Sequence, residues 1–337
     1  MIRTVPEVLG RVRDAVEPAL REAVSRLTPG LQRPVAYHLG WTTPDGTPSP
    51  NNGGKGIRSA LAVLSAEAAD APASVGVPGA VAVELVHNFS LLHDDVIDND
   101  TERRHRPTVW SLFGVGKAII AGDAMLTLAQ QVLLDPPSPP RVWAASALAD
   151  ATAAIIAGQD DDMTFEQRSC VSVEECLAME GRKTGALLAC SAAIGTILAD
   201  GSDELVEALT AFGMHLGWSF QAVDDLLGIW GDPSVTGKPV WSDLRSGKKT
   251  LPIALALANG NGHSEELASL VGAPRSSEAE VERVALLVEA CGGRELTADQ
   301  ARHHFDSAVS ALDRVTLAPG PRCELHELAA FVCERTY

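Results

Sequence analysis

The stretch LVEALTAFGMHLG, residues 205–217, decides the fold class of this 337-residue chain. Its apolar residues recur at spacings of three and four, which is the period of an α-helix. Two further stretches, LAVLSAEAAD at 61–70 and AASALADATAAIIAG at 144–158, repeat this spacing with good helix formers. Alternating runs of β-branched residues are scarce, and aromatic residues make up only 4% of the chain. The sequence therefore predicts a fold that is nearly all α.

Proline- and glycine-rich breaks divide the chain into about ten helical segments. The longest break lies between residues 28 and 56, and shorter ones lie at 133–140 and 318–322. None of them is typical of a long flexible linker, and no repeat of 20 to 50 residues is present. We therefore expect residues 1–337 to form a single domain, one large helical bundle with a buried central helix pair. Near its end, SSEAEVERVALLVEACGG at 276–293 predicts a capped helix that glycines terminate.

The overall charge and the cysteines exclude several classes of protein. The formal net charge is −17, so the surface as a whole repels nucleic acid, and we expect none to bind. The six cysteines form no C-x-x-C pair, which disfavours a zinc knuckle or a disulfide scaffold. The N-terminus carries charges throughout and does not resemble a secretory signal, and charged residues interrupt the longest apolar stretches. We expect a cytoplasmic protein without a membrane span.

An acidic cluster follows an apolar helical run in LLHDDVIDNDTERRHRPTVW, residues 91–110. Asp94 and Asp98 are four residues apart, so on a helix their carboxylates project from one face, about one turn apart, and repel each other. A cation between them would relieve this repulsion, and oxygen ligands of this kind suit magnesium. The alternative is a solvated helix end without a ligand.

A second acidic cluster repeats this arrangement in WSFQAVDDLLGIWGDPSVTGKPVWSDLRSGKK, residues 218–249. Asp224 and Asp225 again end an apolar helical run, and basic residues follow both clusters. Carboxylates beside arginine and lysine side chains favour a diphosphate site with bridging metal ions, whereas a lattice of surface salt bridges is the alternative. The basic residues concerned are Arg103, Arg104, Arg106, Lys238, Arg245, Lys248 and Lys249, together with Lys55, Arg58, Arg182 and Lys183.

These motifs, taken in order, resemble those of the trans-isoprenyl diphosphate synthases, also called polyprenyl synthetases. The resemblance runs roughly from residue 53 to residue 252. The matching segments are GGKGIR at 53–58, DDVID at 94–98 with the arginines at 103 and 104, GQDDD at 158–162, KTG at 183–185, FQ at 220–221 and DDLLGIWGDPSVTGK at 224–238.

The resemblance implies an all-α bundle of the isoprenoid synthase type with a central apolar cavity, usually assembled as a homodimer. It also implies three Mg²⁺ ions in each active site, bound by the two aspartate motifs, whose members here are Asp94, Asp95, Asp98, Asp224 and Asp225. By the same resemblance Arg103, Lys183 and Lys238 hold an allylic prenyl diphosphate, Lys248 lies near the bond that ionises, and Gln221 lies near the developing cation. Lys55, Arg58, His87 and Arg104 match positions that bind isopentenyl diphosphate; for His87 the alternative is an ordinary helical histidine.

The implied activity is a prenyl transfer that joins an allylic diphosphate to isopentenyl diphosphate, lengthens the chain by five carbons and releases diphosphate. Metal ions and lysines neutralise the leaving group, so no side-chain nucleophile is required. We expect geranylgeranyl diphosphate, the C20 product. Two other interpretations stay open, a terpene cyclase on the same scaffold and a non-catalytic partner subunit of an active synthase. Retention of Lys55, Arg58 and Arg104 favours the synthase.

Product length should depend on Phe89, which lies five residues before Asp94 and more than one helical turn away along the apolar run. An aromatic ring there would stop a growing chain, although Phe89 is also an ordinary core residue by composition. The sequence departs from the family pattern at two positions. Gly228 replaces the third aspartate of the second motif, and Ser59 stands where the family often has proline, which we expect to affect only the entry into the helix.

Overall fold

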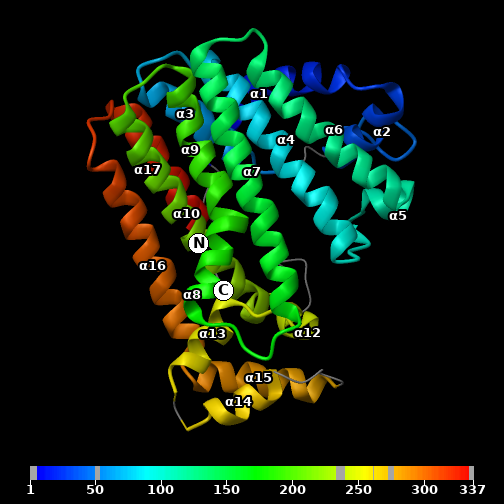
Figure 1. Cartoon of the computed structure of the whole chain (residues 1–337), viewed down its shortest axis with the longest axis vertical. Coiled ribbons are helices and arrows are strands. Elements are labelled where there is room, and N and C mark those ends of the chain that lie inside the picture. Colours follow the sequence, from blue (N-terminus) through cyan, green and yellow to red (C-terminus); the bar gives the residue numbers. More distant parts are fainter. Residues whose placement is uncertain (1–5, 50–53, 233–239, 261, 272–276, 334–337) are drawn as a thin grey trace. The chain divides into compact units, whose positions relative to one another are not determined.

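The computed structural model describes residues 6–49, 54–232, 240–260, 262–271 and 277–333. Helices account for most of these residues, as Figure 1 shows, which confirms the predicted all-α class. The chain groups into two compact units, formed by residues 1–152, 190–210 and 315–328 and by residues 153–189, 211–314 and 329–337. The expectation of a single domain stays a prediction.

The first unit is built on helices that precede and follow the first acidic motif. The elements that lie in it wholly or in part are α1 (Glu7–Ser25), α2 (Pro29–His38), α3 (Ile57–Ala68), α4 (Ala73–Ile97), β1 (Glu102–Arg103), β2 (Arg106–Pro107), α5 (Val109–Phe113), α6 (Val115–Leu134), α7 (Pro139–Glu166), α9 (Ala186–Leu198), α10 (Asp203–Trp230) and α17 (Pro319–Cys333).

Helices α3 and α4 form the core of this unit, and α4 also packs along α6 (Figure 1). Most residues of α3 are buried, because small side chains let its neighbours approach closely. A Cβ added at Gly76 of α4 would lie 2.7 Å from the Ala62 carbonyl oxygen. On another side, the Gly195 backbone N–H of α9 donates to the Ser65 hydroxyl at 2.9 Å. The buried apolar run expected before the first acidic motif is therefore the centre of this unit.

A short β-hairpin, β1 paired antiparallel with β2, interrupts the helices and was not predicted. Its two-residue loop, Arg104 and His105, has φ values of +53° and +59°. Two positive φ values are typical of the tight turn that matches the twist of paired strands, a place where asparagine and glycine are preferred. An arginine and a histidine in this conformation carry backbone strain.

The second unit contains the second acidic motif. Besides parts of α7, α9, α10 and α17, it comprises α8 (Val173–Glu180), the π-helix η1 (Gly181–Gly185), α12 (Ser242–Ser246), α13 (Leu251–Ala258), α14 (Ser264–Val271), α15 (Glu278–Ala290) and α16 (Gly293–Leu312). The predicted capped helix is α15, where Ser277 and Glu280 cap each other's backbone and Gly292 follows the last turn with φ +81°. Its apolar face packs against Ile253 and Leu267 in the core of this unit.

In the part of the chain that the structure describes, three helices, α4, α6 and α7, are long and apolar enough to cross a membrane when judged by length and composition alone. Within the most apolar window of each, 61%, 39% and 44% of the residues are buried inside the protein. The apolar residues of α4 thus serve mainly the core, whereas α6 exposes several large apolar side chains, among them Ile119 and Ile120.

Candidate active site

The first acidic motif ends α4. The Asp98 backbone N–H donates to the Asp94 carbonyl oxygen at 2.8 Å, so the two residues are one helical turn apart, as the spacing predicts. Asp94 is half-buried and Asp98 is exposed. Carboxylates that reach solvent on one face of a helix end are suitable ligands for a hard cation.

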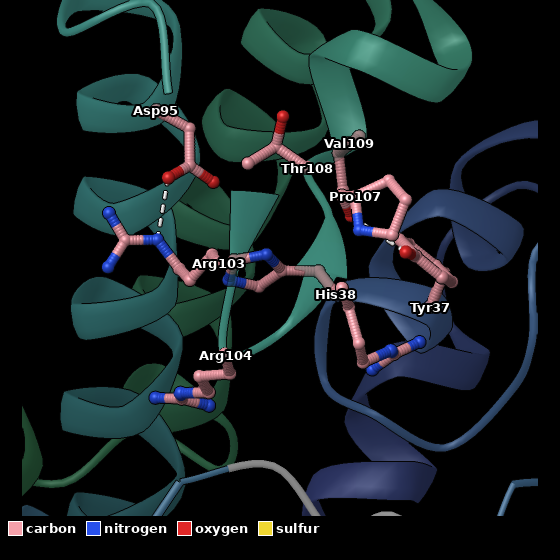
Figure 2. Close-up of a pocket in the computed structure, with 9 residues that line it drawn as sticks. Tyr37, His38, Asp95, Arg103, Arg104, Pro107, Thr108 and Val109 are labelled. Carbon is pink, nitrogen blue, oxygen red and sulfur yellow. Dashed lines mark hydrogen bonds and ion pairs between the residues drawn. The ribbon is translucent and has the colours of Figure 1, made fainter. Parts of the chain in front are cut away.

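Asp95, between them, points inward. Its side chain is only 2% exposed, and its Oδ1 accepts a hydrogen bond from Nε of Arg103 at 2.6 Å (Figure 2). Its Oδ2 is buried and has no hydrogen-bond partner among the described residues. Burial raises the pKa of Asp95 to about 6, although Arg103 acts in the opposite direction. In this conformation Asp95 is an anchor for Arg103, and its predicted role as a metal ligand stays a prediction.

The strained hairpin turn places three arginines around one pocket. The pocket is lined by Arg103, Arg104 and Arg106 together with His38 and Asp95, and we call it the arginine pocket (Figure 2). Arg106 is held by its Nη2, which donates to the Thr42 carbonyl oxygen at 2.9 Å, and by the Tyr37 ring, whose centre lies 4.2 Å from the guanidinium carbon. A Cβ at Gly54 would lie 3.1 Å from Nη2 of Arg104, so a glycine leaves room for this guanidinium.

Three of the residues predicted to bind isopentenyl diphosphate, Arg58, His87 and Arg104, lie in the first unit, where the charges of both arginines act on His87. Burial lowers the pKa of His87 well below its usual value, and the charges of Arg58 and then Arg104 lower it further. His87 is therefore neutral at pH 7, and it sits among cations that can bind an anion. Lys55 is exposed just before α3, whose N-cap Gly56 adopts φ +70°.

Phe89 lies in the contact between α4 and α6. Its side chain is buried, and its ring meets the His93 ring edge to face, with the centroids 4.8 Å apart. A Cβ at Gly122 of α6 would touch both rings, and His93 Nε2 lies 3.1 Å from the Ile119 carbonyl oxygen. His93 was not singled out from the sequence, although its position four residues after Phe89 places both rings on one helical face.

In the second unit, Lys183 lies on the π-helix η1, a wider turn that is frequent at functional sites. Its Nζ forms an ion pair with Oδ2 of Asp162 at 2.5 Å, and neighbouring Arg182 pairs with Asp161 at 2.6 Å. A Cβ at Gly158 would lie 2.5 Å from the Lys183 backbone nitrogen. The GQDDD and KTG segments, quoted separately from the sequence, therefore form one contact in which Gly158 allows the close approach.

Gln221 belongs to a hydrogen-bonded chain. The Thr184 hydroxyl donates to Gln221 Oε1 at 2.8 Å, and Gln221 Nε2 donates to Asp225 Oδ1 at 2.8 Å. The Leu251 backbone N–H donates to the other oxygen of Asp225 at 2.9 Å. Asp225 is buried, which raises its pKa to about 7, and burial likewise raises the pKa of nearby Glu180. Asp225 thus joins α10 to the start of α13, while Asp224 beside it is half-buried.

The Asp243 side chain fills the space beside Gly228, the glycine that departs from the second motif. A Cβ at Gly228 would overlap the Asp243 carboxylate, and the Ser242 hydroxyl of the same short helix donates to the Gly228 carbonyl oxygen at 3.3 Å. Asp243 therefore supplies a carboxylate where the third aspartate of the motif is missing. The Lys248 backbone N–H donates to the Asp243 carbonyl oxygen at 3.1 Å, whereas Lys238 lies outside the described residues.

The two motifs divide their carboxylates in the same manner. Asp95 and Asp225 are buried and hydrogen-bonded, whereas Asp94, Asp98 and Asp224 are at least partly accessible. In the described part of the chain no three His, Cys, Asp or Glu side chains close on a single point. Magnesium is usually held by one or two carboxylates, with water and substrate phosphates completing its shell, so the accessible aspartates fit this ion.

The side chain of Ser59 contacts α4, which the sequence did not indicate. Its side chain is buried, and its hydroxyl donates to Oε2 of Glu84 at 3.3 Å. The expectation that Ser59 affects only the helix entry is wrong, because a hydroxyl at this position reaches across to α4. The sequence offered no signal for Glu84, Asn88 or His38, since each is a single polar residue in or beside an apolar run.

Comparison with known proteins agrees with the geometry. Residues 48–288 match the family model described as polyprenyl synthetase. The chain is 48% identical to a (2E,6E)-farnesyl diphosphate synthase of Mycobacterium tuberculosis, over 99% of this chain and 94% of that protein. It is 39% identical to a geranylgeranyl diphosphate synthase of the same species, over 97% and 93%. A polyprenyl synthetase from Streptomyces coelicolor has a similar structure, with a TM-score of 0.93, 50% identity and coverage of 98% and 99%. The chain belongs to the polyprenyl synthetase family.

Proposed function

We propose that this chain is a Mg²⁺-dependent short-chain prenyl diphosphate synthase, which condenses an allylic diphosphate with isopentenyl diphosphate. The observation that carries the proposal is the grouping of Arg58, His87 and Arg104 in the same unit as Asp94 and Asp98. A synthase needs two diphosphate sites, one next to metal ligands and one formed by cations alone. A cyclase or a partner subunit has no use for the second diphosphate site, the one formed by cations alone.

In this reaction the allylic C–O bond breaks and the diphosphate leaves, and the double bond of isopentenyl diphosphate attacks the resulting cation. Loss of a proton, to the released diphosphate, completes the product. The carboxylates that would hold Mg²⁺ are Asp94 and Asp98 in the first unit and Asp224 in the second, and the ion would neutralise the leaving diphosphate. Lys183, kept in place by Asp162, adds positive charge, and Asp95 fixes the direction of Arg103. We propose three ions per site, with Asp243 acting in place of the missing third aspartate.

We propose that elongation stops at C15 or C20. The relatives at 48% identity are named farnesyl diphosphate synthases, which supports C15 as the main product, and those at 39–40% are named geranylgeranyl synthases. The edge-to-face pair of rings at Phe89 and His93 supports a short product, because two aromatic side chains close the space against α6. The C20 product expected from the sequence is thus the second candidate.

We also propose that the chain acts as a homodimer in the cytoplasm. Val115, Ile119 and Ile120 of α6 are 46%, 40% and 54% exposed. An apolar helix face of this kind marks a protein interface, and a second copy of the chain is the partner that we propose for it. No disulfide joins cysteines of the described residues, in accord with a reducing compartment.

The product profile tests this proposal. The chain is incubated with Mg²⁺, isopentenyl diphosphate and dimethylallyl, geranyl or farnesyl diphosphate, and each allylic primer is also supplied alone. We expect longer prenyl diphosphates in every mixture that contains a usable primer, and no turnover of a primer alone. Hydrocarbons or alcohols formed from a primer alone would identify a cyclase, and a lack of any product would identify a partner subunit.

A further inference from the structure

Two rings of α4, Phe89 and His93, close against one glycine of α6, the helix that packs along α4 in Figure 1. The ring centroids lie 4.8 Å apart and the ring planes form an angle of 66°, so the edge of one ring meets the face of the other. A Cβ added at Gly122 would lie 2.6 Å from Cδ2 of His93 and 3.4 Å from Cδ2 of Phe89. The pair therefore fits against α6 because residue 122 has no side chain.

A hydrogen bond holds the His93 ring on α6. Its Nε2 lies 3.1 Å from the Ile119 backbone carbonyl oxygen, and a carbonyl oxygen only accepts, so Nε2 must carry a proton. Oδ1 of Asp123, one turn further along α6, lies 3.8 Å from the same nitrogen, beyond hydrogen-bond distance. The hydrogen bond thus follows from the position of a backbone carbonyl, and it forms whether or not Nδ1 is also protonated.

The His93 ring limits the positions that the Phe89 ring can take. Phe89 is only 6% exposed, so its ring can reorient only into space that a neighbouring side chain gives up. Side chains of a helix point back toward its N-terminus, so the His93 ring lies over the turn that carries Phe89. Removal of the His93 ring would leave a cavity there, and neighbouring side chains relax into such a cavity. The Phe89 ring, which is in contact with it, is the side chain placed to move.

We propose that His93 is a positioning residue for product length: its ring, hydrogen-bonded to the Ile119 carbonyl oxygen, keeps the Phe89 ring across the far end of the prenyl chain. The proposal rests on the function proposed above, in which Phe89 ends the growing chain. His93 acts through Phe89 and not on the substrate, and Gly122 contributes by leaving room for the ring. Loss of the His93 ring should therefore let the prenyl chain grow past the point at which it normally stops.

His93 also precedes Asp94, so a role in the metal site must be told apart from a role in product length. If the ring served the metal site, its loss would lower kcat and raise the Mg²⁺ concentration required, while the ratio of products stayed the same. If the ring serves Phe89, the ratio of products changes and the Mg²⁺ dependence stays close to that of the wild type. The contact of one aromatic pair corresponds to roughly a twofold to tenfold change in this ratio.

The test measures by chromatography the products that the full chain forms from dimethylallyl diphosphate, excess isopentenyl diphosphate and Mg²⁺. Three variants separate the ring of His93 from its N–H group. His93→Ala removes both, His93→Phe keeps a ring without the N–H group, and His93→Gln keeps an N–H donor without the ring. His326→Ala, at an exposed histidine of α17, is the control for the loss of a histidine.

We expect the ratio of longer to shorter products to rise roughly twofold to tenfold in His93→Ala and in His93→Gln, and less in His93→Phe, which keeps the ring contact. In the Phe89→Ala background, His93→Ala should add less than it does in the wild type, because the two residues act as a unit. An unchanged ratio in His93→Ala would overturn the proposal. So would an equal increase in both backgrounds, or a change confined to kcat and the Mg²⁺ requirement.

Two further measurements do not depend on turnover. Calorimetry with Mg²⁺ and without isopentenyl diphosphate compares the binding of farnesyl and geranylgeranyl diphosphate. His93→Ala should shift the preference toward the longer diphosphate, and an unshifted preference would overturn the proposal. Should the variants not fold, the ¹⁵N resonances of the wild type decide: His93 Nε2 must carry a proton that exchanges slowly with water, and an unprotonated Nε2 would contradict the proposal.

The two proposals fail in different ways. If the chain elongates prenyl diphosphates but neither product ratio nor binding preference responds to His93, the role of His93 is wrong and the synthase stands. If no primer is elongated but His93→Ala shifts binding toward the longer diphosphate, the role of His93 stands and the proposed function is wrong.

Discussion

Replacing Gly228 by aspartate restores the usual second motif, yet the structure predicts that it destabilises the protein. The new Cβ would overlap the Asp243 carboxylate, so one of the two side chains must leave its position. Overpacking of this kind costs about 1–3 kcal/mol, to which the repulsion of two carboxylates adds. The better helix propensity of aspartate over glycine returns only a few tenths of a kcal/mol.

A double-mutant cycle isolates this effect. We expect Gly228→Asp to lower the free energy of unfolding by about 2 kcal/mol and the addition of Asp243→Ala to recover most of that loss, since residues in contact couple by about 0.5–3 kcal/mol. Urea unfolding of the wild type, both single variants and the double variant measures the coupling. Equal m-values check that the four proteins expose the same amount of surface on unfolding. Gly228→Ala, which adds the Cβ without the charge, is the matched control.

Additive effects, or a Gly228→Asp variant as stable as the wild type, would refute the inference that Asp243 occupies the place of the third aspartate. A double variant that also keeps its affinity for Mg²⁺ and diphosphate would show further that either residue can supply the carboxylate.

Four more outcomes follow from the same geometry. Asp94→Ala should lower kcat/KM at least roughly a hundredfold, because the metal would no longer stabilise the leaving charge, and Asp94→Glu should recover part of the lost activity. A steady-state assay over a range of Mg²⁺ concentrations measures both variants. Near-normal turnover of Asp94→Ala would remove Asp94 from the metal site. Phe89→Ala should lengthen the products seen by chromatography, and an unchanged distribution would reject Phe89 as the floor. The pKa of Asp225 is raised to about 7, so the native state keeps a proton that the unfolded state loses near pH 4, and this residue destabilises the fold as the pH rises from about 4 to 7. The melting temperature of Asp225→Asn should therefore increase relative to that of the wild type across this pH range. A difference in melting temperature that does not change with pH would contradict the raised pKa. Ile120→Lys should turn the proposed dimer into a monomer in light scattering, and a dimer that persists would place the interface elsewhere.

The sequence was sufficient for the helices, because their apolar spacing and their caps are local properties. Ser277 and Glu280 cap α15 as the pattern predicted, and Asp94 and Asp98 lie one turn apart. The hairpin at Arg104 and His105 was missed, because neither residue prefers a positive φ. Contacts with distant parts of the chain, such as the hydrogen bond from Arg106 to the Thr42 carbonyl oxygen, hold a hairpin that the local sequence does not favour.

Within the site, the sequence located the charged motifs but not the residues that hold them. The order of the motifs gave Asp94, Lys183 and Arg104, because charge clusters beside apolar runs are visible without coordinates. The contacts of Gly228 with Asp243 and of Ser59 with Glu84 could not be seen, since each joins residues 15 or more positions apart through a single side chain. The structure thus shows a partner for each departure from the family pattern, Asp243 at Gly228 and Glu84 at Ser59.

Release of diphosphate tests the central claim most directly. With dimethylallyl diphosphate, isopentenyl diphosphate and Mg²⁺ present, one diphosphate should appear for each new carbon–carbon bond, and none should appear when isopentenyl diphosphate is left out. Diphosphate released at an undiminished rate from the allylic substrate alone, or its absence from the complete mixture, would contradict the account.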